Sequence, residues 1–264
     1  MNDLKVSIIT PSYNQGKFIG RTIDSILNQS YKNIEYIVMD GGSTDETVRI
    51  LKKYSNKIIW KSKKDNGQSE AINKGLKMAS GEIVAFLNSD DTYEPEAIAK
   101  VVNFFQNNPK IKWVYGKCRI VDENDIEIRK PITLYKNFLL KKYNYRILLT
   151  ENYISQPATF WRKNLHDEIG YLNEREHYTM DYEFWLRIGK KYKAGVINDY
   201  LANFRMYSSS KSGSLVNPQF KDELRIAKKF SQGDKLPIFF HKLNYYKITG
   251  IYRLMAKVKR VGSK

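Results

Sequence analysis

The sequence predicts an α/β fold in which a mixed, mostly parallel sheet is flanked by helices. Two observations carry this prediction: strand-like and helix-like segments alternate through residues 6–105, and polar clusters follow the strand-like segments. The chain has 264 residues, of which 42% are hydrophobic, so it can bury a large core. Disorder of the whole chain is therefore excluded.

The first part of the chain alternates regularly. Short β-rich runs predict strands at 6–10, 34–39, 57–61 and 83–87. Apolar residues at helical spacing predict the intervening and following helices, at 18–27, 48–51, 71–79 and 95–105. Strands and helices in this order favour parallel strands with right-handed connections.

After residue 109 the pattern is less regular. We expect strands at 113–117, 119–122, 126–129 and 157–161, a basic and partly helical loop at 135–145, a helix with Met180, Phe184 and Ile188 on one face, and a strand within 195–205. A Ser-rich linker at 208–214 leads into a basic helical tail at 217–264. The predicted organisation is a main domain at 1–207, with halves at about 1–110 and 111–207, and an extension at 208–264.

Polar clusters follow three of the predicted strands. PSYN follows the first strand, DGGSTD the second and NSDD the fourth. Ligands of parallel α/β sheets bind outside the carboxyl ends of the strands, so these clusters predict one binding edge. The sequence contains neither GxxxxGK[ST] nor GxGxxG. A bound nucleotide would therefore be held by carboxylates, a metal and backbone amides.

The charge of the chain is strongly basic and unevenly distributed. Lys+Arg 45 against Asp+Glu 28 gives a net charge of +17, and residues 221–264 hold 12 basic and 3 acidic side chains, a net +9. Such a chain is attracted to anions. A single cysteine, Cys118, excludes an internal disulfide and a cysteine-based zinc cluster. No RNA- or DNA-binding motif is present in the sequence, so we expect no nucleic-acid partner.

The tail at 235–264 has two interpretations. Its aromatic and aliphatic residues alternate with Lys and Arg, which fits an interfacial helix on an anionic membrane surface. The alternative is an amphipathic helix docked on the main domain. No apolar run approaches the roughly 18–20 residues of a membrane span, and the N-terminus lacks a signal-peptide pattern. We expect a cytoplasmic protein. If the tail binds lipid, the protein would attach peripherally to the inner face of the cell membrane.

Several acidic residues are candidates for chemistry. Asp90 and Asp91 end a predicted strand, where a carboxylate pair suits a hard divalent cation; the alternative is an acidic turn before the next helix. Asp40, at another strand tip, is expected to contact a ligand, whereas Asp45 fits an ordinary turn before a helix. Asp181 lies near the start of an amphipathic helix, where the helix dipole alone would favour it.

Together, the motifs resemble those of family 2 glycosyltransferases. The resemblance begins with VSIITPSYNQGKFIGRTIDSILNQSYKNIEYIVMDGGSTDET and continues in DNGQSEAINKGLKMASGEIVAFLNSDD, QPATFWRK and MDYEFWLRIGKKY. It covers roughly residues 4–205 and leaves the tail uncovered. The order and spacing of the four segments make the resemblance specific, although each segment alone is weak.

The resemblance implies a GT-A (Rossmann-like) fold, a nucleotide-sugar donor, a divalent metal (Mg or Mn) and transfer with inversion. The halves at about 1–110 and 111–207 would then hold the donor and the acceptor. By the same resemblance, Pro11, Tyr13 and Asn14 match the first donor-site loop, Asp40 matches the carboxylate that contacts the base, and Asp65 lies in the segment that frames the nucleotide. Asp91 matches the direct metal ligand, and Asp90 matches a position near the ribose or the metal. Asp181 matches the catalytic base.

Two positions depart from the family pattern. Asn88 stands where many relatives carry the first Asp of a longer acidic run, which lowers the negative charge of the metal site. Met180 stands where a Glu often precedes the base, so Asp181 lacks an acidic neighbour in sequence. The assignment of Asp181 therefore depends on the surrounding DYEFWLR segment.

The predicted function is an inverting glycosyltransferase. We expect a UDP-sugar donor and a glycan or lipid-linked acceptor, in the synthesis of bacterial surface polysaccharide or cell-envelope glycan. A sugar-nucleotide nucleotidyltransferase is one alternative, although PSYNQG poorly matches the Gly-rich basic loop of that class. A non-catalytic basic protein that binds RNA or membrane is another. Release of nucleoside diphosphate from a nucleotide sugar distinguishes the three.

Overall fold

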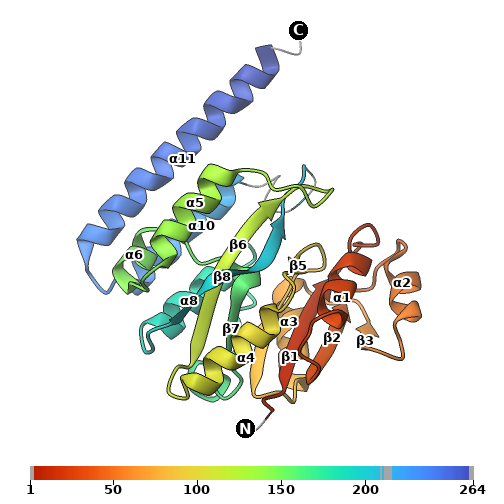
Figure 1. Ribbon diagram of the computed structural model, residues 1–264. Helices are drawn as coiled ribbons and strands as arrows, with labels where there is room; N and C mark the ends of the chain where they lie inside the picture. The colour runs from red at the N-terminus through yellow and green to blue at the C-terminus, as the bar shows by residue number, and fades with distance from the viewer. Residues whose placement is uncertain (1–2, 209, 211–215, 262–264) are drawn as a thin grey trace.

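The computed structural model describes residues 3–208, 210 and 216–261 (Figure 1). Its centre is an eight-stranded sheet with the order β3-β2-β1-β4-β7-β6-β8-β5. The strands are β1 (Val6–Ser12), β2 (Ile34–Asp40), β3 (Ile59–Ser62), β4 (Ile83–Phe86), β5 (Thr92–Tyr93), β6 (Trp113–Val121), β7 (Thr159–Arg162) and β8 (Gly195–Arg205). The helices are α1 (Ile19–Leu27), α2 (Thr47–Lys53), α3 (Gln68–Met78), α4 (Ala97–Asn107), α5 (Lys130–Leu140), α6 (Tyr145–Thr150), the 3₁₀ helix η1 (Gln156–Ala158), α7 (Leu165–Ile169), α8 (Met180–Gly189), α10 (Val216–Phe230) and α11 (Lys235–Val261).

The sheet is mixed and mostly parallel, as the sequence predicts. Strands β3, β2, β1 and β4 pair in parallel, and so do β6 and β8, whereas β7 and β5 run antiparallel to their partners. Because β1, β2 and β4 point the same way, the loops that follow them meet at one edge of the sheet. The three polar clusters found in the sequence are these loops.

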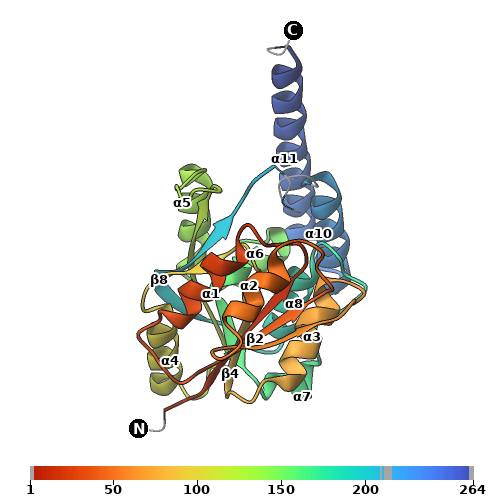
Figure 2. The same cartoon turned by 90° about the vertical axis from the view of Figure 1, so that its right-hand side faces the viewer.

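Both faces of the sheet are covered by helices. Alternate residues of a strand point to opposite faces, and the two fully buried neighbours Ile8 and Ile9 belong to two different core clusters. The cluster around Ile8 includes residues of α1, α2 and α4, and the cluster around Ile9 includes residues of α3 and α8. Figure 2 shows α4 and α3 on opposite sides of the sheet. Each buried Ile contributes roughly 1.5–3 kcal/mol through removal of apolar surface from water.

Three tryptophans hold α8 against the sheet. Trp185 on α8 stacks on Trp113 of β6, with ring centroids 5.7 Å apart and planes 14° apart. It also meets Trp161 of β7 edge-on at 5.7 Å. All three side chains are fully buried. The start of α8, which carries Asp181, is therefore fixed by packing against the central strands.

Some predicted elements beyond residue 109 are wrong. One continuous strand, β6, replaces the strands at 113–117 and 119–122, because its pairing with β8 persists through register shifts around Lys117. Close approach of the two strands requires Gly116, where a Cβ would lie 2.4 Å from Leu201 Cδ1. The segment 126–129 forms only an isolated bridge, between Glu127 and Val121. The segment 135–145 is partly helical, as predicted: it contains the end of α5, a turn and the first residue of α6.

Smaller differences concern the ends of elements. The third strand begins at Ile59 and the helix after NSDD at Ala97, each two residues later than predicted. The predicted Ser-rich linker at 208–214 lies mostly outside the described residues. The division of the chain at residue 207 stays a prediction.

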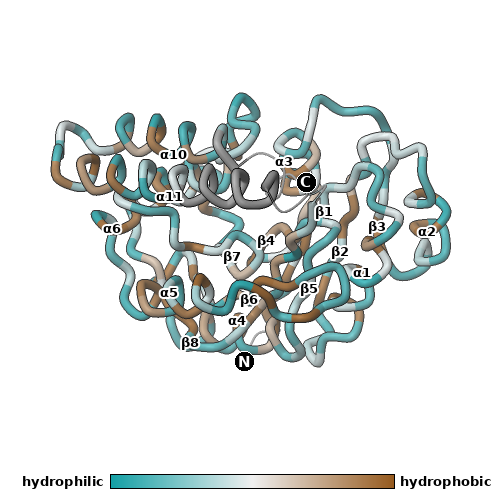
Figure 3. The backbone as a smooth tube through the Cα atoms, turned by 90° about the horizontal axis from the view of Figure 1, so that it is seen from above, coloured by the Kyte–Doolittle hydropathy of each residue, from teal (hydrophilic) through white to brown (hydrophobic). Residues whose placement is uncertain are grey.

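The tail, which the sequence predicts to be helical, contains two helices. Helix α10 packs against α8 and α6 and adds the fully buried Ile226 and Ala227 to the core. Helix α11 packs against α10 and α6 and then continues past the rest of the molecule (Figure 1). Figure 3 shows α10 and α11 side by side. Within the described residues, none of the helices combines the length and the apolar character that a membrane crossing requires.

Candidate active site

A cavity of about 1470 Å³ opens at the edge of the sheet where the polar loops meet. The loops after β1, β2, β3 and β4 form one side, and residues of α5, α8, α10 and α11, with the loops after α6 and before α8, form the other. After the roles expected from the sequence, they are called the nucleotide side and the acceptor side. Lining residues on the nucleotide side include Pro11, Ser12, Tyr13, Gly41, Gly42, Asp65 and Asp90. Those on the acceptor side include Lys136, Asn152, His177, Asp181, Glu223, His241 and Tyr245.

The loop after β1 offers two kinds of side chain. Pro11 and Tyr13 line the cavity, and the Tyr13 ring is 61% exposed, so a flat ligand can stack on it. Asn14 connects this loop to the next one. Its backbone N donates a hydrogen bond to Ser43 Oγ at 2.8 Å, and its side-chain Oδ1 accepts one from Thr44 N at 2.9 Å. The left-handed backbone of Asn14 (φ 52°) permits both contacts.

Asp40 shapes the loop after β2. Its Oδ2 accepts hydrogen bonds from Ser43 N at 2.9 Å and from Ser62 Oγ at 2.6 Å, and the residue is buried. The adjacent Gly41 lines the cavity beside Asp65. A Cβ on Gly41 would lie 3.0 Å from Asp65 Oδ2, so glycine permits this close approach. The cavity wall here is therefore Gly41 and Asp65, with Asp40 bonded within the loop beside them.

The two neighbouring carboxylates after β4 have different surroundings. Asp90 is half-buried and lines the cavity, and its Oδ2 accepts a hydrogen bond from the Tyr207 hydroxyl at 3.1 Å. Asp91 is fully buried, with Oδ1 accepting from Arg205 N at 2.8 Å and Oδ2 from Asn88 Nδ2 at 3.2 Å. Burial, together with the charge of Asp90, raises the pKa of Asp91 well above its ordinary value. Burial also raises the pKa of Asp90.

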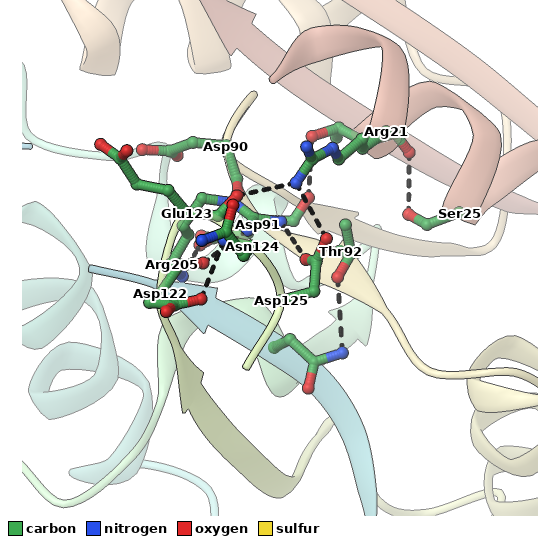
Figure 4. Close-up of polar contacts among 12 residues, drawn as sticks. Arg21, Ser25, Asp90, Asp91, Thr92, Asp122, Glu123, Asn124, Asp125 and Arg205 are labelled. Carbon is green, nitrogen blue, oxygen red and sulfur yellow. Dashed lines mark hydrogen bonds and ion pairs between the residues drawn. The ribbon is translucent and has the colours of Figure 1, made fainter. Parts of the chain in front are cut away.

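Arg205, at the end of β8, connects the loops around these carboxylates (Figure 4). Its buried guanidinium donates to Asp90 O at 2.8 Å and to Asp122 O at 2.7 Å, and it forms an ion pair with Asp125. It also lies 5.2 Å from the centre of the Phe18 ring. Sequence analysis missed Arg205, because its position at the end of a strand gives no local signal of these contacts. Its bonds fix the backbone from which the Asp90 side chain reaches the cavity.

Asp90 fits a metal ion that arrives with a phosphorylated ligand. Among the described residues, no group of three His, Cys, Asp or Glu side chains has the arrangement of a metal site. Mg²⁺ is commonly bound by one or two carboxylates together with substrate phosphates, so a single carboxylate in a cavity suits it. A cation beside Asp90 would also offset the cost of burying its charge. Of the two carboxylates that sequence analysis assigns to the metal, Asp90 is the one in the cavity wall.

Asp181 begins α8 and lines the acceptor side of the cavity. It is half-buried, and its Oδ1 accepts a hydrogen bond from Tyr182 N at 2.8 Å. The preceding Met180 packs inward, where its Sδ accepts from Ser69 Oγ of α3 at 2.8 Å. At the start of the helix, Asp181 and the buried Met180 both line the cavity, and Met180 also packs in the core.

A second carboxylate on the acceptor side comes from α10. Glu223 is 5% exposed and lines the cavity, and its Oε1 accepts hydrogen bonds from Gln219 and Asn152. Burial, with a contribution from the charge of Asp181, raises the pKa of Glu223 to about 7. Sequence analysis missed Glu223. Its only signal is an acidic pair, Asp222 and Glu223, in a basic helix.

Comparisons with known proteins identify the family to which the sequence is similar. Residues 7–170 match the sequence profile described as Glycosyl transferase family 2. An uncharacterised glycosyltransferase of Rickettsia conorii is 32% identical over 220 residues, which cover 80% of this chain and 36% of that protein. One of Haemophilus influenzae is 30% identical over 220 residues, covering 78% of this chain and 67% of that protein. The chain thus matches little more than a third of the length of the Rickettsia conorii relative.

Solved structures show the same fold. The Staphylococcus aureus protein TarS (residues 1–349, in complex with UDP-GlcNAc) superposes with a TM-score of 0.68 at 22% identity, over 87% of this chain and 67% of that chain. The mannosyltransferase PcManGT from Pyrobaculum calidifontis, in complex with GDP-Man and Mn²⁺, superposes with a TM-score of 0.63 at 16% identity, over 99% of this chain and 81% of that chain. The predicted fold class is confirmed.

Proposed function

Because the chain belongs to glycosyltransferase family 2 and has the GT-A fold, we propose that it is an inverting, metal-dependent enzyme that moves a sugar from a nucleotide-sugar donor to an acceptor hydroxyl. The observation that carries this proposal is one cavity with two chemical sides. Asp90 lies on the nucleotide side and Asp181 on the acceptor side. The reaction requires both a stabilised leaving group and a base.

We propose a UDP-sugar as the donor. The support is the nucleotide side of the cavity, where Tyr13 offers a ring for stacking and Asp65 a carboxylate for base or ribose groups. Ser12 Oγ is buried in this wall and has no hydrogen-bond partner among the described residues, so it is available to a ligand. The TarS structure contains UDP-GlcNAc and the PcManGT structure GDP-Man, which supports a nucleotide sugar in this fold.

On the nucleotide side, the residues of this chain would hold the leaving group. A divalent cation, Mg²⁺ or Mn²⁺, bound by Asp90 would stabilise the negative charge that develops on the diphosphate. The Tyr207 hydroxyl orients the Asp90 carboxylate, and Arg205 fixes its backbone. The buried Asp91 keeps the loop in shape through Arg205 N and Asn88.

On the acceptor side, Asp181 would act as the general base. Its carboxylate takes the proton of the acceptor hydroxyl as the oxygen bonds to the anomeric carbon. Attack from the face opposite the diphosphate inverts that carbon, and no covalent bond to the protein is needed. The packing of Trp185 against the sheet keeps the start of α8 in place during this step.

We further propose that α11 attaches the protein to an anionic membrane surface, at the cytoplasmic face. Leu236, Phe239, Phe240, Leu243 and Tyr246 recur at helical spacing and are exposed. The exposed Lys235, Lys242 and Lys247 accompany them. The other face of α11 packs on the domain, with His241 buried against Leu149 O at 2.8 Å. The helix thus combines docking on the domain with an apolar and basic outer face.

A lipid-linked acceptor would be presented at the same membrane surface. This supports a glycan or lipid-linked acceptor and a role in bacterial surface polysaccharide or cell-envelope glycan synthesis. Incubation of the full chain with a panel of nucleotide sugars and Mg²⁺ or Mn²⁺ tests the proposal. We expect release of nucleoside diphosphate with transfer to a hydroxyl, and a product with inverted anomeric configuration. Release of pyrophosphate would indicate a nucleotidyltransferase, and no turnover of any sugar nucleotide would favour a non-catalytic protein.

A further inference from the structure

Glu223 stands at the acceptor side of the cavity, although it lies outside the matched family segment 7–170. Its helix, α10, is held in place by Ile226 and Ala227, which are fully buried against the main domain. The position of Glu223 is therefore fixed by packing. A buried carboxyl group in the wall of a cavity requires a reason, because its charge is costly to bury.

The contacts of Glu223 leave hydrogen-bonding capacity for a ligand. Its Oε1 accepts from Gln219 Nε2 at 3.2 Å and from Asn152 Nδ2 at 3.4 Å, and these are its hydrogen bonds among the described residues. Asn152 Oδ1 is buried and has no hydrogen-bond partner within the same set of residues. Asn152 and Glu223 both line the cavity, so two acceptor groups lie side by side in its wall.

The groups around Glu223 include some that raise its pKa and some that lower it. Burial and the charge of Asp181 raise its pKa, whereas Lys136 on α5 and the hydrogen bonds lower it, with the result at about 7. Burial lowers the pKa of His241 on α11 below its ordinary value, so that group titrates in more acidic solution. Helix α10 and the described parts of the helices packed against it carry further titratable or charged side chains: Lys221, Asp222, Arg225, Lys228 and Lys229 on α10, Tyr182, Glu183 and Arg187 on α8, Tyr145 and Arg146 on α6, and Lys235, Lys242, Tyr245, Tyr246 and Lys247 on α11. Arg225 forms ion pairs with Asp222 and with Glu176.

We propose that Glu223 is an acceptor-binding residue, whose carboxylate accepts a hydrogen bond from a hydroxyl of the sugar acceptor beside the hydroxyl that Asp181 deprotonates. Asn152 Oδ1 accepts a second hydrogen bond from the same acceptor. The inference rests on the proposed function, because it assigns the acceptor of that reaction to this wall. A polyhydroxylated acceptor fits, since each sugar hydroxyl can donate one hydrogen bond.

Protonation of Glu223 then controls binding. The ionised carboxylate is the stronger acceptor, because hydrogen bonds to charged groups are roughly twice as strong as neutral ones. Acceptor affinity should therefore rise as the pH increases through about 7. The substitution Glu223→Gln replaces the carboxyl group with a neutral amide of nearly the same shape. The variant should behave at every pH as the wild type does in acidic solution.

The test measures binding of a panel of octyl glycosides to the full chain, with saturating UDP and Mg²⁺, at pH 5.5 and 8.5. For the wild type we expect an affinity about tenfold higher at pH 8.5, the effect of about one charged hydrogen bond. Glu223→Gln should lose this rise and match the wild type at pH 5.5. Asp222→Asn makes the same charge change on the same helix at a residue outside the cavity wall, and this variant should keep the rise.

Each other outcome overturns the proposal. A Glu223→Gln variant with the wild-type rise shows that Glu223 does not bind the acceptor, and a wild type that binds no glycoside places the acceptor elsewhere. If Glu223→Gln does not fold, the Asn152→Ala variant provides the test. We expect it to bind the glycoside more weakly than the wild type at both pH values. An unchanged glycoside affinity would contradict the proposal. Release of UDP from UDP-GlcNAc without any glycoside is measured separately. Its absence would count against the proposed donor reaction, while the binding arm would still test Glu223.

Discussion

The two sides of the cavity are built differently. On the nucleotide side, the loops follow neighbouring parallel strands, and several of their polar side chains bind the loops themselves: Asn14 joins two loops, Asp40 closes a turn and Asp91 bonds to Arg205. On the acceptor side, the helices α5 and α8 are distant in sequence from each other and from α10 and α11, and each of the four contributes two or more residues to the wall. These motifs therefore hold both residues whose side chains bond within the loops and residues that line the cavity, and the sequence alone does not separate the two.

The largest effect is expected for the proposed base. Asp181→Asn should lower kcat by about 10²–10⁴, the usual contribution of general-base catalysis, because the amide cannot take a proton. The KM for the donor should change little, since Asp181 lies on the acceptor side. Steady-state kinetics with varied donor concentration measure both quantities. A raised donor KM with normal kcat would instead place Asp181 in donor binding.

The next prediction separates the two carboxylates after β4. Asp90→Asn should lower kcat/KM by about 10²–10³, because the cavity would lose the carboxylate that is proposed to hold the metal. Asp91→Asn should stay within about tenfold of the wild type, because Asn Oδ1 can still accept from Arg205 N in that buried position. The two variants are measured side by side across Mg²⁺ concentrations, with circular dichroism as the control for folding. Equal losses in both variants would show that the loop works as one unit.

A third prediction concerns stability on the acceptor side. The pKa of Glu223 is raised from 4.5 to about 7 in the folded protein. An acid with a raised pKa destabilises the folded state as the pH rises from the unfolded to the folded value. Glu223→Gln should therefore be more stable than the wild type at pH 8.5, by up to about 3 kcal/mol, and equally stable near pH 4. Urea unfolding at both pH values measures this difference, and a less stable variant at pH 8.5 would contradict it.

The smallest expected effect concerns the outer face of α11. Replacing Phe239 and Leu243, both exposed, with Ser should weaken binding to vesicles that contain anionic lipid by about tenfold or more, because apolar area is no longer buried in the interface. Turnover of a water-soluble acceptor should not change, since neither residue lines the cavity. Co-sedimentation at low and high salt measures binding, with phosphatidylcholine vesicles as the control. A wild type that ignores anionic vesicles at low salt would contradict the proposed attachment.

The sequence predicts the nucleotide side well because its signals are local. Alternation of strands and helices locates β1, β2 and β4, and the topology brings their loops together. The sequence does not separate Asp90 from Asp91, because their surroundings depend on Arg205, which comes from β8. The local sequence pattern also predicts two short strands where β6 is continuous, because the continuity depends on pairing with β8.

The acceptor side was less predictable for the same physical reason. Helix α5 lies in a segment predicted as a partly helical loop, and its place depends on packing against β6. Glu223 lies in a tail whose basic charge pointed to lipid, and only the docking of α10 on α8 brings it to the cavity. Asp181 was found through the resemblance of its segment, since its position at a helix start has an ordinary explanation.

Helices α10 and α11, at the end of the described chain, line part of the cavity, and this has a consequence for protein engineering. A recombination point just after Tyr207 would keep Tyr13, Asp65 and Asp90 on one parental piece and place Glu223 and His241 on the other. Exchange of the terminal piece would replace part of the acceptor wall and the outer helix at once, without a change to the sheet. Under the proposed function, such an exchange would alter one part of the acceptor wall, while Asp181 and the nucleotide side would stay together on the first piece.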